Sequence, residues 1–251
     1  MYRAAVPIAL DHLLAIVLVI LFPVRAALFS YRRLTAAEPG DLPRVRLALY
    51  KQGIAIQWTL AACAVALWAW QGRRWVMLGV VPQLNWGLLG VAVGFAIIAG
   101  YVLAQRGRAL EDPEALARLR HQMRNVERMM PRGAEELRWF SRLSVTAGLC
   151  EDLLYRGYLI WYLGTWFALA PAALIASVVF GFGHAYQGPR GIAVTSLVGV
   201  FMSAIYLLTG SLVACSAFHA LMDLHAGHTA QVAFSREEVA VGTATPESPG
   251  G

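Results

Sequence analysis

Two carboxylates and a guanidinium occur together in a part of the sequence that is otherwise apolar. Glu151, Asp152 and Arg156 stand at the start of a hydrophobic segment that continues to Ala173. A charged side chain at the centre of a bilayer costs about 2.5–3.5 kcal/mol on insertion scales, and such residues usually pair with one another or serve a function. Three charges in one short apolar run therefore mark the first place to look for chemistry.

The spacing of these charges gives them different tasks on a helix. Asp152 and Arg156 are four residues apart and share a helix face, which suits an ion pair. Glu151 is five residues from Arg156 and faces another direction, so it is available to act as a general base. The alternative is that all three residues form one pairing cluster between helices and do no chemistry.

Two histidines lie in equally apolar surroundings further along the chain. His184 stands near the end of a short hydrophobic segment, and His219 lies in the last one, four residues before Asp223. On a helix His219 and Asp223 share a face. A lone histidine in a membrane helix is also a common hydrogen-bond partner for a neighbouring helix. Together with Glu151, the histidines supply the acid, base and polar groups that a chemical site inside a membrane needs.

The three cysteines, Cys63, Cys150 and Cys215, show no spacing typical of a metal site or a disulfide framework. Their simplest interpretation is that of small apolar side chains. Cys150 differs because it directly precedes Glu151, about 100° away around an ideal helix. It therefore stands apart from the other two cysteines, although the apolar filler remains an interpretation for it as well.

The composition predicts an all-α polytopic membrane protein. Hydrophobic residues make up 58% of the 251-residue chain and charged residues 14%, against the usual quarter of charged residues. Asp11 and His12, near the start of the first apolar segment, are expected to reach the lipid headgroups, with a position facing the bundle interior as the alternative. About seven segments are long enough or nearly long enough to cross a bilayer: 5–30, 52–70, 85–104, 146–167, 171–187, 191–209 and 211–233.

Two basic segments, 31–51 and 105–142, predict the orientation. The excess of arginine places both on the cytoplasmic side of a bacterial inner membrane, in a multi-pass protein. The longer one carries nine arginines against six acids and is expected to form an amphipathic helix on an anionic leaflet. It lacks interleaved aromatic residues, so a nucleic-acid partner is not expected. Residues 1–234 then form one integral membrane domain with a motif-bearing core at 145–230, and 235–251 form a disordered polar tail.

The polar patterns together resemble the CPBP family, the CAAX-protease and bacteriocin-processing group of intramembrane peptidases. The family motifs are two adjacent glutamates with an arginine four residues beyond the second, Phe-x-x-x-His, and His-x-x-x-Asn/Asp. This sequence reads Glu151-Asp152-x-x-x-Arg156, Phe180-x-x-x-His184 and His219-x-x-x-Asp223. The resemblance covers residues 145–230 and departs from the family pattern where Asp152 replaces the second glutamate.

The resemblance implies a glutamic-type endopeptidase that cleaves a membrane-embedded peptide or protein. The family residues matched by Glu151 and His184 activate a water molecule. Those matched by His219 and Asp223 stabilise the oxyanion. No cofactor is expected, and the alternative is a metalloprotease in which Glu151, His184 and His219 bind zinc.

Cys150 opens a second interpretation within the enzymes. A cysteine before the catalytic glutamate resembles the myxosortase branch of the family, proposed to process C-terminal sorting signals on surface proteins. A thiolate there could form an acyl-enzyme and pass it to another acceptor. From other classes come a non-catalytic membrane scaffold or immunity protein, and a proton-relay transporter, which has no use for His219 with Asp223.

Overall fold

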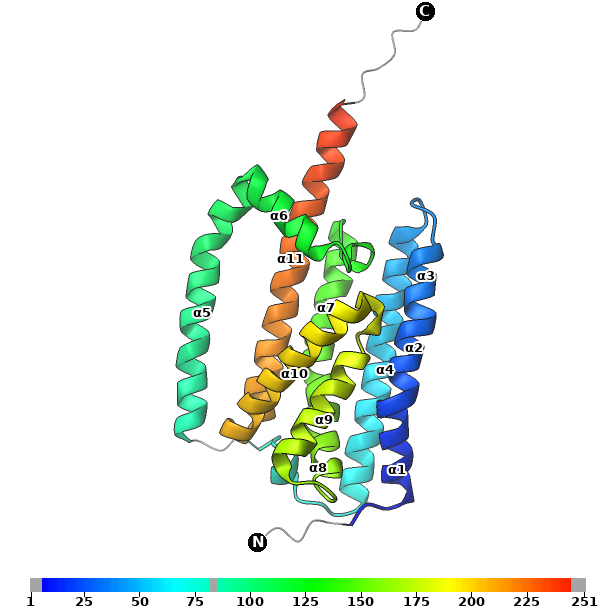
Figure 1. The fold of residues 1–251 in the computed structure, drawn as a ribbon, viewed down its shortest axis with the longest axis vertical. Helices are drawn as coiled ribbons and strands as arrows, with labels where there is room; N and C mark the ends of the chain where they lie inside the picture. The colour runs from blue at the N-terminus through cyan, green and yellow to red at the C-terminus, as the bar shows by residue number, and fades with distance from the viewer. Residues whose placement is uncertain (1–5, 82–84, 245–251) are drawn as a thin grey trace, which may run out of the picture.

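The protein is a bundle of helices, with no strand among the residues that the structure describes (Figure 1). The computed structural model describes residues 6–81 and 85–244. The α-helices are α1 (Ala9–Ile16), α2 (Phe22–Arg25), α3 (Tyr31–Ala36), α4 (Leu42–Trp70), α5 (Trp86–Glu111), α6 (Pro113–Met123), α7 (Ala134–Asp152), α8 (Ile160–Leu163), α9 (Leu169–Phe182), α10 (Gly188–Thr209) and α11 (Leu212–Ala244). Three π-helical stretches, η1 (Val17–Leu21), η2 (Ala26–Ser30) and η5 (Leu153–Leu159), and three 3₁₀ turns, η3 (Trp75–Leu78), η4 (Glu127–Met129) and η6 (Ala185–Gln187), lie between them.

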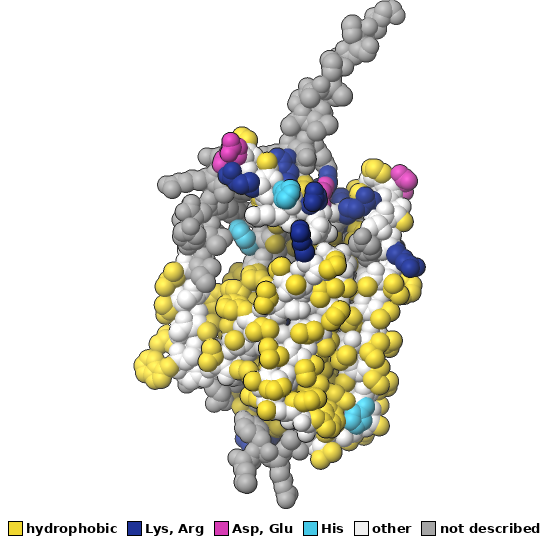
Figure 2. All heavy atoms as spheres, viewed as in Figure 1, with side chains coloured by type: hydrophobic (Ala, Val, Ile, Leu, Met, Phe, Trp, Pro, Cys, Tyr) yellow, Lys and Arg dark blue, Asp and Glu magenta, His cyan; other side chains and the backbone are white. Residues whose placement is uncertain are grey.

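The surface is that of a membrane protein. Figure 2 shows hydrophobic side chains over most of the visible face, with Lys, Arg, Asp and Glu gathered toward one end. In the described part of the chain, three continuous helical segments are long and apolar enough to cross a bilayer, Ala9–Ala36, Leu42–Trp70 and Ala185–Thr209. Shorter apolar helices occupy Trp86–Ile97 and Leu169–Phe182. The predicted all-α membrane bundle is confirmed, and the number of about seven crossings stays a prediction.

The first helix carries a buried ion pair where the sequence predicted a residue at the headgroups. Asp11 is 0% exposed and accepts hydrogen bonds from Arg73 at 2.8 and 2.5 Å. The Tyr158 hydroxyl donates another at 2.7 Å. The prediction for Asp11 was wrong because Arg73, distant in sequence, folds back and compensates the buried charge. His12 is exposed and its Nδ1 contacts the Tyr162 hydroxyl at 2.8 Å.

The basic segment 105–142 is divided between three helices, whereas the sequence predicted one amphipathic helix. Helix α5 runs on to Glu111, Pro113 opens α6, and α7 begins at Ala134. The Asp112 side chain caps α6 by accepting the Glu114 N–H at 2.9 Å. Proline has no N–H with which to continue α5 and is favoured in the first turn of a new helix. The cap and the proline together explain the break.

The last helix extends beyond the predicted membrane domain. Helix α11 continues to Ala244, ten residues into the segment expected to be a disordered tail from 235. Apolar residues in that stretch, Val239 to Val241 among them, are compatible with a helix. Residues 245–251 of the predicted tail lie outside the described residues.

Close helix contacts fix the part of the bundle that carries the motifs. Helix α7 packs against α4 and α11, and α9 packs along α10. A Cβ atom at Gly148 would lie 2.6 Å from the Ser216 carbonyl oxygen of α11. A Cβ atom at Gly181 would lie 2.8 Å from the Ile192 carbonyl oxygen of α10. Both distances are far inside ordinary contact, so these two glycines let the helices approach and set the depth at which the polar residues meet.

Candidate active site

The acidic motif lies at a change of helix geometry. Glu151 and Asp152 end α7, and Arg156 lies in the π-helical stretch η5 that follows. Single turns of π-helix are rare and occur frequently at functional sites. Asp152 and Arg156 are 0% and 1% exposed, and Arg156 Nη1 lies 2.9 Å from Asp152 Oδ1. The structure thus contains the ion pair expected from the spacing, buried inside the bundle.

Glu151 is held by a residue from another helix. The Gln57 side chain on α4 donates a hydrogen bond from Nε2 to Glu151 Oε1 at 2.7 Å. The other carboxylate oxygen, Oε2, has no hydrogen-bond partner among the described residues. Glu151 lines a cavity of about 320 Å³, which His184 and Asp223 also line. One oxygen of the carboxylate is therefore fixed, while the other is buried without a hydrogen-bond partner among the described residues.

His184 lies just beyond the end of α9 and has a defined tautomer. Its Nδ1 lies 3.0 Å from the carbonyl oxygen of Phe180. Because a carbonyl oxygen only accepts, Nδ1 must carry the hydrogen, and Nε2 of the neutral ring keeps a lone pair. The spacing Phe-x-x-x-His thus has a physical reason, since the carbonyl one helical turn earlier orients the imidazole. The arrangement suits a histidine that accepts a hydrogen bond inside the cavity.

The first and third motifs meet at Asp152. His219 Nδ1 lies 3.6 Å from Asp152 Oδ2, and His219 Nε2 lies 3.9 Å from Asp223 Oδ2. The Arg156 guanidinium carbon lies 4.1 Å from the centre of the Phe180 ring, which also contacts the His219 ring edge-on at 5.9 Å. Asp152 therefore touches both Arg156 and His219, a link between separate helices that helix spacing alone does not show.

His219 and Asp223 lie at different depths. Asp223 lines the cavity, and 39% of its side chain is exposed there. His219 is only 6% exposed and is not among the residues that line the cavity, although its Nε2 lies near Asp223, which does line it. The structure brings Glu151, His184 and Asp223 to one cavity, whereas His219 does not line that cavity.

Cys150 faces a different side of α7. It lines a separate groove of about 480 Å³ together with Trp58, Leu153 and Ser216, and that groove contains none of the three cavity residues. The thiol is 1% exposed. Neighbouring residues on a helix point about 100° apart, and here that rotation directs Cys150 and Glu151 to different surroundings.

The predicted zinc ligands do not converge on one point. One oxygen of Glu151 is bonded to Gln57, Nδ1 of His184 is bonded to a carbonyl, and His219 lies between two carboxylates. Within residues 6–81 and 85–244, no group of three or more His, Cys, Asp or Glu side chains is arranged to hold a metal ion. The three residues are thus not grouped as metal ligands among the described residues, and a mechanism without a metal stays a prediction.

Gln57 is the site residue that the sequence analysis missed. It lies in α4, far from the three motifs, and is 6% exposed. The sequence feature that could have indicated this role is a glutamine inside a predicted membrane-spanning segment. Polar side chains in such segments usually form hydrogen bonds to another helix. Neither spacing nor motif could identify Glu151 as its partner, because the two residues are 94 positions apart.

The comparison with known families agrees with this geometry. Residues 133–225 match the family model described as Type II CAAX prenyl endopeptidase Rce1-like. Searches of curated proteins and of solved structures gave no match. The matched stretch contains all three motifs, from Glu151 to Asp223, whereas Gln57 and α4 lie outside it. Residues 133–225 are therefore similar to the Rce1-like CAAX proteases of the CPBP family, a family of intramembrane peptidases.

Proposed function

We propose that the protein is a glutamic-type endopeptidase that cleaves a membrane-embedded or membrane-associated peptide. The observation that carries the proposal is the shared cavity, in which the Glu151 carboxylate has one unbonded oxygen and His184 has a lone pair on Nε2. The cavity lies inside an apolar bundle, where water is scarce and a positioned base acts strongly. A multi-pass position in a bacterial inner membrane, with the arginine-rich end in the cytoplasm, is part of the proposal.

The mechanism assigns one task to each residue. Glu151 takes a proton from a water molecule whose oxygen attacks the scissile carbonyl carbon. His184 Nε2 accepts a hydrogen bond from the same water and orients it. The carbonyl electron pair moves to the oxygen and returns when the carbon–nitrogen bond breaks. We infer that substrate binding brings His219 Nε2, which lies beside Asp223, into reach of this oxygen, so that His219 stabilises it by donating a hydrogen bond and Asp223 orients the ring. When the carbon–nitrogen bond breaks, Glu151 returns its proton to the leaving amine, so that two neutral termini are released before they ionise.

The test is to compare membranes of cells that produce either the wild-type protein or Glu151→Gln. New protein termini are enriched and identified by mass spectrometry. We expect at least one new terminus that forms only with the wild-type protein. The same cleavage is then carried out in H₂¹⁸O by purified protein in liposomes, and it should place one ¹⁸O atom in the new carboxyl group. If no terminus distinguishes the two membranes, the protein is not a peptidase of membrane proteins under those conditions and the scaffold interpretation gains support.

Cys150→Ala is expected to leave the rate of cleavage within about threefold of wild type, because truncating a small buried side chain outside the cavity costs packing rather than chemistry. The groove that Cys150 lines is separate from the cavity of Glu151, which supports this expectation. The rate is measured on the substrate identified above. A complete loss of activity in a folded Cys150→Ala protein would favour the sorting peptidase, in which the thiol carries an acyl group.

Gln57→Leu is expected to lower kcat by about 10- to 100-fold, since a hydrogen bond to a charged group contributes about 1.5–3 kcal/mol. Leucine has nearly the same volume but cannot donate to Glu151 Oε1. A matched control is Gln52→Leu on the same helix, where the side chain accepts only an exposed hydrogen bond from Arg33. A positioning role predicts that kcat falls while KM changes little, whereas a purely structural role predicts a lower unfolding temperature with unchanged kcat in the folded fraction.

A further inference from the structure

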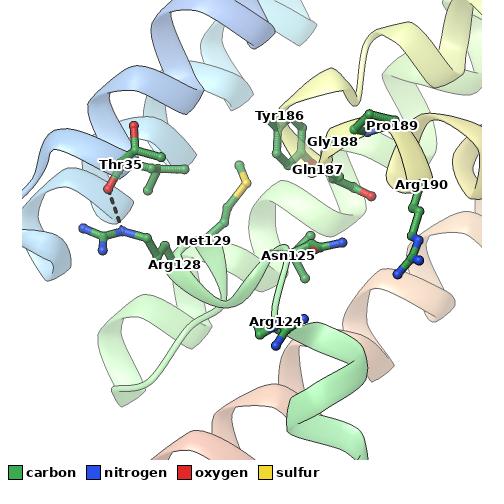
Figure 3. A pocket seen from close by; sticks show the side chains of 12 residues that line it. Thr35, Arg124, Asn125, Arg128, Met129, Tyr186, Gln187, Gly188, Pro189 and Arg190 are labelled. Atoms are coloured by element: carbon green, nitrogen blue, oxygen red, sulfur yellow. Dashed lines mark hydrogen bonds between the residues drawn. The ribbon is translucent and has the colours of Figure 1, made fainter.

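A second pocket opens beside the candidate active site, at the polar end of the bundle. It has a volume of about 620 Å³, within the range of sites that bury small ligands. Its walls come from three places: the end of the first long helix at Leu34 and Thr35, the turn 124–129, and the start of α10 with η6 before it. Figure 3 shows the side chains that line it.

The lining of this pocket is basic. Arg124, Arg128 and Arg190 line it, and none of its lining residues within the described chain is acidic. Arg128 is fixed, because it donates to the carbonyl oxygens of Leu34 at 2.8 Å and Ala37 at 2.6 Å. Arg124 and Arg190 are exposed, and neither forms an ion pair with a described residue. In Figure 3 the Arg124 side chain lies below Asn125 and the Arg190 side chain lies to its right. We call this pocket the basic vestibule.

The basic vestibule adjoins the cavity of Glu151 and His184. Four residues line both spaces: Val126, Met129, Tyr186 and Gln187. The turn η6 leads directly from His184 to Gly188 and so connects the two along the chain. A peptide whose scissile bond reaches Glu151 from this end of the bundle therefore has its flanking residues in the basic vestibule.

We propose that the basic vestibule binds a carboxylate on the substrate peptide, either a terminal carboxylate or an acidic side chain next to the scissile bond. Guanidinium groups recognise carboxylates by paired, charge-assisted hydrogen bonds. Neutral polar side chains in the same wall, Thr35, Asn125 and Gln187, suit the amides of a peptide better than the tails of a lipid. The proposal rests on the proposed peptidase function, because it identifies the part of the substrate that this site selects.

The test measures binding of synthetic peptides to full-length protein in phosphatidylcholine nanodiscs. Each peptide carries a palmitoyl chain, a dansyl group and one of four endings: Asp-Glu or Asn-Gln, each as the free acid or the amide. The protein carries Glu151→Gln so that no peptide is cleaved. Each exposed charge pair contributes little to affinity, so we expect the peptide with most carboxylates to bind about five- to tenfold more tightly than the neutral peptide. The amide and acid forms identify which carboxylate matters.

The double variant Arg124→Gln/Arg190→Gln should lose this preference, and Arg44→Gln should keep it. Arg44 is an exposed arginine at the same end of the bundle and lines neither space. Equal binding of acidic and neutral peptides by the parent protein, or an unchanged preference in the double variant, overturns the proposal. Loss of the preference in nanodiscs that contain phosphatidylglycerol also overturns it, because the vestibule then binds lipid headgroups. Since binding is measured without cleavage, a missing cleavage product contradicts the peptidase function alone.

Discussion

Replacing Glu151 with glutamine is expected to lower the turnover number by about 10²–10⁴-fold, the range typical of removing a general base. Glutamine has the shape of glutamate, and its carbonyl oxygen can still accept the hydrogen bond that Gln57 donates at 2.7 Å. The amide cannot take a proton from water, so only the chemical step should be lost. The measurement is the initial rate of product release from the identified substrate, with the protein reconstituted in liposomes.

Two further variants make this result specific. Glu135→Gln removes an exposed carboxylate from the same helix and should leave the rate unchanged. Glu151→Asp keeps a carboxylate but shortens its reach by one methylene, so it should keep a small part of the activity and weaken the contact with Gln57. If Glu151→Gln turns over as fast as wild type, Glu151 is a pairing residue and another group activates the water.

The sequence allowed much of the site to be predicted because its motifs are local. The four-residue spacings fix which side chains share a helix face, and they yield the pairing of Asp152 with Arg156 and the contact of His219 with Asp223. The composition likewise predicts the apolar bundle, since hydrophobic periodicity and length need no tertiary information. The roles of these residues in catalysis stay predictions until activity is measured.

The contacts that could not be predicted all join residues distant in sequence. Gln57 meets Glu151 across 94 positions, and Asp11 meets Arg73 across 62. Each of these polar residues alone indicates that a partner exists, because a buried polar group in a membrane needs one. A single sequence does not say which partner, since that depends on how the helices cross.

These distant contacts also show that the site extends beyond the part of the chain that matches the family. The match to the family model spans residues 133–225, but the hydrogen bond that orients Glu151 comes from α4. The wall between the cavity and the basic vestibule includes Val126 and Met129, which also precede the matched region. The proposed chemistry therefore resides in the shared core, and its positioning and selectivity reside in the helices packed around that core.

His184→Asn is expected to lower kcat by about 10²-fold or more, because it removes the hydrogen-bond acceptor that orients the attacking water. The asparagine amide nitrogen occupies nearly the position of Nδ1 and can still donate to the Phe180 carbonyl, which His184 contacts at 3.0 Å. Asparagine has no atom at the position of Nε2, so the acceptor of the water's hydrogen bond is lost. His184→Gln extends its amide to the position of Nε2, where its oxygen can accept a hydrogen bond, so this variant should recover part of the lost rate.

Rates and unfolding temperatures of both variants are compared with those of a control, His12→Asn. His12 lies in another apolar helix, and its Nδ1 contacts the Tyr162 hydroxyl. That control should keep its activity, because His12 is not among the residues that line the cavity. Wild-type turnover in His184→Asn would contradict the assigned role. Equal and severe losses in the asparagine and glutamine variants, with unfolding temperatures unchanged, would show that Nε2 must take up a proton, since glutamine can accept a hydrogen bond but cannot be protonated in this way. In that case His184 is the base, and Glu151 holds the water for it.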